Sequence, residues 1–173
     1  MMRCFKGGAL GFRGRYYAGR ESWIKAADDG NVAFKILQQC QQLAPGNHDI
    51  MLGTGLYNYY ASALPEQYPA LKAVMMFLPK GDKNIGIMQL QAAGRGAKYA
   101  ATEAKVSLLQ VWYQFEKNAV EALPVAMDLY TRYPKNPYFH RYVGRCQVML
   151  GMWTEMEQTW RNVVNRCINR NIG

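Results

Sequence analysis

Hydrophobic residues recur three and four positions apart along nearly the whole chain, and strict alternation of hydrophobic and polar residues is rare. The first spacing keeps apolar side chains on one face of an α-helix, whereas a half-buried strand needs the second. The pattern therefore predicts an all-α protein, divided by turn-forming residues into about nine helices of modest length. The predicted interruptions lie at residues 19–22, 44–49, 64–69, 78–84, 94–102, 117–121, 133–137 and 150–155.

One set of spacings occurs twice, and such a period is typical of stacked helix pairs. A small residue is followed by proline and then by glycine, first at Ala33, Leu37, Pro45, Asn47 and Gly55, and again at Ala122, Ala126, Pro134, Asn136 and Gly144. Small side chains allow two helices to approach to about 8–10 Å, and a proline ends a helix because it lacks the backbone N–H. The repeat therefore predicts antiparallel helical hairpins, with close contacts at Ala33, Gly86, Ala122 and Gly144.

The pattern resembles the tetratricopeptide repeat (TPR), which consists of two antiparallel helices. In the last unit the first-helix positions hold His140, Val143, Gly144 and Gln147, the turn is residues 150–153, and Met156 and Trp160 follow in the second helix. The preceding unit supplies Val106, Leu109 and Tyr113, then Ala122, Ala126 and Pro134. The match is partial, since Met156 replaces a small alanine and Gln110 replaces a glycine.

The resemblance implies a right-handed superhelix of TPR-like antiparallel helical hairpins, an α-solenoid, formed by residues 1–173 as a single domain. Residues 55–94 resemble the inclusion-body-clearance type of eukaryotic TPR proteins, and bacterial TPR-like proteins without assigned activity. Within this segment Asp82 is the expected N-cap of a helix whose core face holds Gly86, Leu90 and Ala93. The chain begins within a helical pattern, which is also compatible with the C-terminal part of a longer protein.

In the TPR family one face of the first helix lines a concave groove that binds extended peptides, often through basic residues. Arg141 and Arg145 are one helical turn apart and share a face with Tyr138 and, further along, with Val148 and Met149. Arginine offers a fork of donors that matches carboxylates or phosphates. The expected peptide-binding groove comprises Tyr59, Tyr60, Gln114, Phe115, Tyr138, Arg141 and Arg145. Two alternatives stay open: a solvated basic face for the arginines, and core packing for Tyr59 and Phe115.

The charge balance favours an acidic partner. Lys and Arg number 21 against 12 Asp and Glu, for a formal net charge of +9. The charge alone does not choose among peptide, nucleic acid and membrane. The resemblance to TPR proteins implies a protein or peptide partner, and a basic nucleic-acid or acidic-surface binding module is the alternative. Residues 11–20 interleave three arginines with aromatic residues, which suggests a nucleic-acid surface, but nucleic acid is the less favoured partner.

The residues that carry chemistry are few and dispersed. The four cysteines form no C-x-x-C pair and there are only two histidines, so neither a zinc site nor a disulfide framework is expected. His140 and Cys146 are about 600° apart around a helix, so they do not share a face, and His140 is expected in the core. Asp28 and Asp29 are expected as surface charge. No catalytic residue, metal or cofactor is expected, and an enzyme with a pocket inside the superhelix is the least favoured class.

No apolar run approaches the length of about 20 residues that a membrane-spanning helix needs, and the first residues lack the features of a signal peptide. The compartment is therefore unknown: cytoplasmic if the chain is complete, and open if its N-terminus is truncated. Exposed apolar faces at the ends of repeat arrays often pair with a second copy, so a homodimer is one expected assembly.

Overall fold

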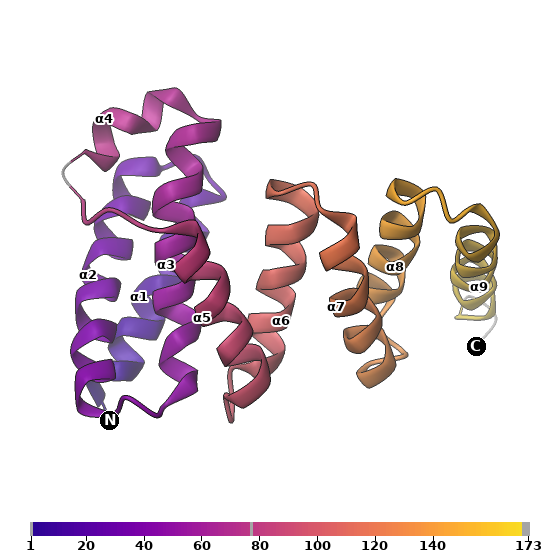
Figure 1. The fold of residues 1–173 in the computed structure, drawn as a ribbon, viewed down its shortest axis with the longest axis horizontal. Coiled ribbons are helices and arrows are strands. Elements are labelled where there is room, and N and C mark those ends of the chain that lie inside the picture. The colour runs from indigo at the N-terminus through magenta and orange to yellow at the C-terminus, as the bar shows by residue number, and fades with distance from the viewer. Residues whose placement is uncertain (1, 77, 171–173) are drawn as a thin grey trace. The chain divides into compact units, whose positions relative to one another are not determined.

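The computed structural model describes residues 2–76 and 78–170. All regular secondary structure in these residues is helical, with no strand among them, which confirms the all-α prediction. The elements are α1 (Met2–Ala18), α2 (Trp23–Leu43), α3 (His48–Gln67), a 3-10 turn (Pro69–Leu71), α4 (Lys72–Met75), α5 (Lys83–Gly96), α6 (Ala101–Gln110), a π-helical turn (Val111–Phe115), α7 (Ala119–Arg132), α8 (Pro137–Met149) and α9 (Trp153–Arg170) (Figure 1). No helix within the described part of the chain is both long and apolar enough to cross a bilayer.

The chain forms two compact units, which divide after Ala104. In the first unit, α1 packs against α2 and α3 packs against α5, while α2 also contacts α3. In the second unit, α7 packs against the π-helical turn and α8, and α8 packs against α9. Helical neighbours in sequence are thus neighbours in space within each unit, as the hairpin prediction requires.

The two blocks that share a sequence spacing also share a local structure. Each begins with a buried small residue in the second helix of a pair, Ala33 in α2 and Ala122 in α7. Each then passes through a short turn to an asparagine whose side-chain oxygen accepts a hydrogen bond from the N–H two residues later, at 3.0 Å for both Asn47 and Asn136. The backbone bonds of the turns also correspond: Ala44 to Cys40 and Asn47 to Ala44 in one block, Tyr133 to Leu129 and Asn136 to Tyr133 in the other. The repeated spacing therefore encodes a repeated helix–turn–helix shape.

Glycines lie where paired helices come closest. A Cβ atom added to Gly86 of α5 would lie 2.6 Å from the backbone nitrogen of Tyr59 in α3, and one added to Gly55 would lie 3.0 Å from the carbonyl oxygen of Gly86. In the second unit, a Cβ at Gly144 of α8 would lie 2.9 Å from the indole ring of Trp160 in α9. These contacts confirm the expected role of small residues between helices.

Helix α5 follows the prediction closely. The side chain of Asp82 accepts a hydrogen bond of 2.9 Å from the backbone N–H of Ile85, so Asp82 is the N-cap. Gly86, Leu90 and Ala93 are all buried. For α5, the capping residue and the spacing of apolar residues were sufficient to predict where the helix begins and which side of it is buried.

The turn expected at residues 64–69 begins later than predicted. Helix α3 continues through Pro65 and ends at Gln67, with the N–H of Tyr68 bonded to the carbonyl of Leu64. A proline removes only one N–H donor, so the helix continues two residues beyond Pro65, and the hydrogen bond from Tyr68 closes its last turn.

Asp29 corrects a prediction, because it is buried rather than a surface charge. Its two carboxylate oxygens accept hydrogen bonds from Nε and Nη2 of Arg13, both at 2.7 Å. These bonds hold the pKa of Asp29 below its ordinary value, against the opposing effect of burial. The carboxylate faces α1, so the Arg13–Asp29 ion pair joins α1 to α2.

Candidate functional site

Helix α8 positions the candidate site in the second unit. Asn136 caps its first turn and Pro137 occupies its first helical position, where a missing N–H costs nothing. One side of the helix is buried, and its members include Phe139, His140, Val143, Gly144 and Cys146. Arg141 and Arg145 lie on the exposed side. The burial pattern thus leaves a basic edge of α8 open to solvent.

Two tyrosines beside that edge are held by glutamines from the preceding hairpin. The hydroxyl of Tyr142 accepts a hydrogen bond of 2.8 Å from Nε2 of Gln114, and the hydroxyl of Tyr138 accepts one of 3.0 Å from Nε2 of Gln110. The two tyrosine rings lie 4.9 Å apart between centroids. Burial, together with the hydrogen bond to Tyr138, raises the pKa of Tyr142 to about 12, so its hydroxyl stays protonated at neutral pH.

One arginine of α8 brings positive charge to these rings. The guanidinium carbon of Arg145 lies 5.3 Å from the ring centroid of Tyr142, a cation–π contact that orients the side chain. Helix α8 contains no acidic residue. Within residues 2–76 and 78–170, neither Arg141 nor Arg145 forms an ion pair. The α8 face, defined as Gln110, Gln114, Tyr138, Arg141, Tyr142 and Arg145, therefore carries two uncompensated cations beside ordered aromatic rings.

Four of the residues proposed from sequence belong to this face: Gln114, Tyr138, Arg141 and Arg145. Tyr142 joins them, and the sequence interpretation missed it although it lies one turn after Tyr138. Gln110 was missed as well, although it lies one turn before Gln114. A search for polar and aromatic residues four positions apart on consecutive first helices would have found both.

The predicted groove residues of α3 lie in the first unit and differ in exposure. Tyr59 is fully buried, so it is a core residue and offers no surface to a ligand. Its ring packs edge-to-face on Tyr60 at 5.4 Å. Tyr60 is half-buried; burial raises its pKa, and the charge of Arg15 opposes this rise.

A π-helical turn carries Gln114 and the half-buried Phe115. The N–H of Glu116 bonds to the carbonyl of Val111, five residues back, at 3.0 Å. Lys117 follows with φ of 52°, a left-handed conformation that is uncommon for residues other than glycine. Such turns frequently occur at functional sites, and this one directs Gln114 towards Tyr142. The spacing of apolar residues in the sequence does not predict this π-helical turn.

The candidate nucleophile and base of α8 are packed in the core. His140 is buried and stacks on Tyr130 with ring centroids 4.3 Å apart, as expected for a core histidine. Burial and the nearby charge of Arg166 lower its pKa. Burial raises the pKa of Cys146 to about 11, so this thiol is protonated at neutral pH. The described part of the chain contains no group of three His, Cys, Asp or Glu side chains that could hold a metal ion.

No known protein family matches the chain, and no curated protein or solved structure matches it significantly. The structure defines the class of protein coarsely: an all-helical protein of antiparallel hairpins.

Proposed function

We propose that the protein is a protein- or peptide-binding scaffold and that the α8 face binds an acidic segment. In this proposal the hairpins are TPR-like repeats stacked in a right-handed superhelix whose concave side includes the α8 face. The observation that supports it best is the exposure on one face of Arg141 and Arg145, which form no ion pair within the described residues, with Arg145 over the ring of a tyrosine that Gln114 holds.

The chemistry of the α8 face suits a carboxylate-bearing peptide. An exposed arginine presents a planar fork of N–H donors, which a carboxylate can accept in pairs. Tyr138, which is half-buried, adds aromatic surface at low entropic cost because its hydrogen bond to Gln110 already orders it, while the buried Tyr142 supports Tyr138 and Arg145 from below. Arg145 is likewise oriented by the ring beneath it. The acidic side chains of the peptide would set its orientation, and apolar side chains beside them would contact the exposed part of Tyr138.

The proposal can be tested with a library of short random peptides selected on the intact protein. We expect the selected peptides to be enriched in Asp and Glu. The best binder is then titrated against the variant with Arg141→Glu and Arg145→Glu, and its affinity should fall by about 100-fold, because attraction becomes repulsion at two positions.

The matched control carries Arg3→Glu and Lys6→Glu, two exposed changes on α1 that alter the net charge equally. Its affinity should fall far less. Circular dichroism should show equal helix content in both variants. Equal affinities for the two variants, or no enrichment of acidic residues, would refute this site.

The alternative of nucleic-acid binding rests on the basic segment of α1, where Arg20 lies 5.2 Å from the ring centroid of Tyr16. The structure weakens this alternative, since Arg13 pairs with Asp29 and Arg15 pairs with Glu103 at 3.0 Å. A nucleic-acid binder should show retention on heparin and a steep loss of affinity with salt.

A further inference from the structure

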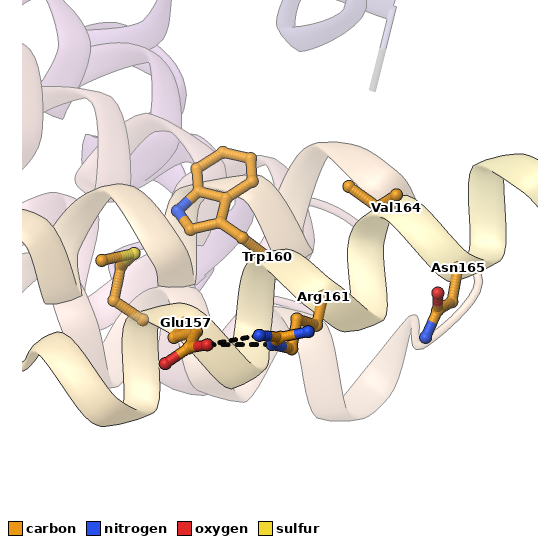
Figure 2. A pocket seen from close by; sticks show the side chains of 6 residues that line it. Glu157, Trp160, Arg161, Val164 and Asn165 are labelled. Carbon is orange, nitrogen blue, oxygen red and sulfur yellow. Dashed lines mark hydrogen bonds and ion pairs between the residues drawn. The ribbon is translucent and has the colours of Figure 1, made fainter.

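Helix α9 has an apolar face that its own hairpin does not cover. Trp153, Val164 and Ile168 are 62%, 53% and 52% exposed, and they lie along one side of the helix with the half-buried Met156 and Trp160. Trp160 and Val164 help to line an open hollow, and Figure 2 shows both side chains on the same edge of α9. We call these five residues the α9 stripe.

A different side of α9 makes the intrachain contacts. Thr159 and Val163 are buried, and Arg166 lies over the ring of Tyr130 at 5.7 Å. The ring of Trp160 covers Gly144 of α8 and so borders both sides of the helix. The exposed residues of the α9 stripe therefore take no part in the packing of α9 against α8.

Charged residues flank the stripe in a pattern that can match itself. Glu157 and Arg161 lie one turn apart and form an exposed ion pair, with Nη2 and Oε1 separated by 2.6 Å (Figure 2). When two such helices run antiparallel, Glu157 of each copy lies beside Arg161 of the other. In a parallel two-fold pair the charged edges of the two helices would lie on opposite sides of the interface and would not meet. The charges thus favour one orientation of a self-association.

We propose that the α9 stripe is an interface that pairs, antiparallel and with two-fold symmetry, with the α9 stripe of a second copy of this chain. Burial of the exposed tryptophan, valine and isoleucine would drive the association, and the flanking charges would set its direction. Helix α9 has 18 residues, which makes it about 27 Å long. An interface of one helix per copy is at the small end of specific interfaces, so the dimer should be weak and concentration-dependent.

The first experiment is sedimentation equilibrium of the intact protein over a range of concentrations. The Val164→Glu variant should raise the dimer dissociation constant by about 100-fold, because it places two charges inside the apolar interface. Ile24→Glu is the matched control: Ile24 is 74% exposed on α2, so dimerisation should be unchanged. A protein that is monomeric at every concentration, or a dimer that Val164→Glu leaves intact, would overturn the proposal.

A second experiment separates contacts between copies from those within a copy. Glu157→Arg and Arg161→Glu each break the intrahelical ion pair and place like charges across the proposed interface, so each variant alone should dimerise about tenfold more weakly. An equimolar mixture of the two variants should recover dimerisation, since all facing charges are then opposite. Mixing cannot repair a contact within one chain. A mixture no tighter than its components would overturn the antiparallel pairing.

The exposed thiol of Cys167 provides a check on orientation. In the antiparallel pair the two Cys167 residues lie about 24 Å apart along the helix axis, too far for a disulfide bond. We expect no Cys167–Cys167 cross-link in oxidised glutathione at protein concentrations where the dimer forms. Rapid cross-linking, lost in the Cys167→Ser variant, would indicate a parallel arrangement and overturn the proposal.

Discussion

At the scale of single residues, the same amino acid has opposite effects at different places in the helices. Gly86 faces the backbone of α3, and an added methyl group would meet Tyr59 at 2.6 Å. Gly11 of α1 has nothing within 4 Å of an added Cβ. Glycine in a helix interior costs about 1 kcal/mol relative to alanine, so Gly11 bears this cost with no packing benefit in the described contacts.

This contrast gives a prediction at the residue scale. Gly86→Ala should lower the free energy of unfolding by about 3 kcal/mol, because the backbones of α3 and α5 would have to separate. Gly11→Ala should raise it by about 0.5–1 kcal/mol through helix propensity. Urea denaturation of both variants measures the two effects. Changes of the same sign would show that the close approach of α3 and α5 does not decide the choice of residue.

At the scale of helices and turns, polar side chains fix where elements begin and how loops are held. Asp49 in the first turn of α3 accepts hydrogen bonds from the backbone N–H groups of Ala100, Tyr99 and Lys98, at 2.7, 2.8 and 3.3 Å. Burial by itself raises the pKa of Asp49, but these three donors outweigh it and the pKa lies below its ordinary value. One carboxylate thus attaches the loop before α6 to the start of α3.

The depressed pKa of Asp49 determines how stability depends on pH. The ionised carboxylate stabilises the folded state above the ordinary carboxyl pKa, and this contribution disappears as the pH falls through the folded-state value. Asp49→Asn should therefore unfold more easily at pH 7, by about 1–3 kcal/mol, and the difference should shrink towards pH 3. Urea denaturation at both values is the test. An unchanged difference at acidic pH would exclude the charge as the cause.

The two asparagine caps allow a second prediction at this scale. Asn47→Ala and Asn136→Ala should each lower the free energy of unfolding by about 1 kcal/mol, because each removes the acceptor for an N–H at a helix start. Asn84→Ala, an exposed change inside α5, is the control and should not destabilise the protein. Clearly unequal effects at Asn47 and Asn136 would count against an equivalent role in the two blocks.

At the scale of the whole molecule, each of the two compact units contains a buried apolar cluster. The second unit is centred on Leu109, Ala122, Ala126 and Leu129. A smaller cluster in the first unit contains Leu37, Cys40 and Ile50. Repeat proteins are stabilised mainly by contacts between neighbours, so a local weakness spreads only as far as those contacts reach.

The division into two compact units predicts a localised response to damage. Hydrogen exchange measured by mass spectrometry on the Gly86→Ala variant should show faster exchange in α3 and α5. Exchange in α8 and α9 should match that of the unmodified protein. Equal acceleration in both units would show that the whole chain unfolds as one cooperative block.

Much of the fold was predictable because its signals are local. The spacing that begins at Ala33 and Ala122 gave the hairpins, and Asp82 and Gly86 gave the start and the packed side of α5. The candidate site was only partly predictable. Arg145 and Tyr138 were predicted because they share a face of one helix. The hydrogen bond between Gln114 and Tyr142 was not predicted, because it joins side chains 28 residues apart in sequence. Tyr59 was predicted from its position in the helix to face a groove, but the packing of neighbouring helices buries it.

The sequence by itself determined the all-helical fold, the hairpin pairs, the caps and the small residues at helix contacts, because helix periodicity and capping depend on residues a few positions apart. The tertiary structure decided which side of each helix is covered. It buried Asp29 against Arg13, formed the π-helical turn that brings Gln114 to Tyr142, and left the α9 stripe exposed. These outcomes depend on which helices become neighbours, and a residue's exposure is a property of its neighbours as much as of its own place in the pattern.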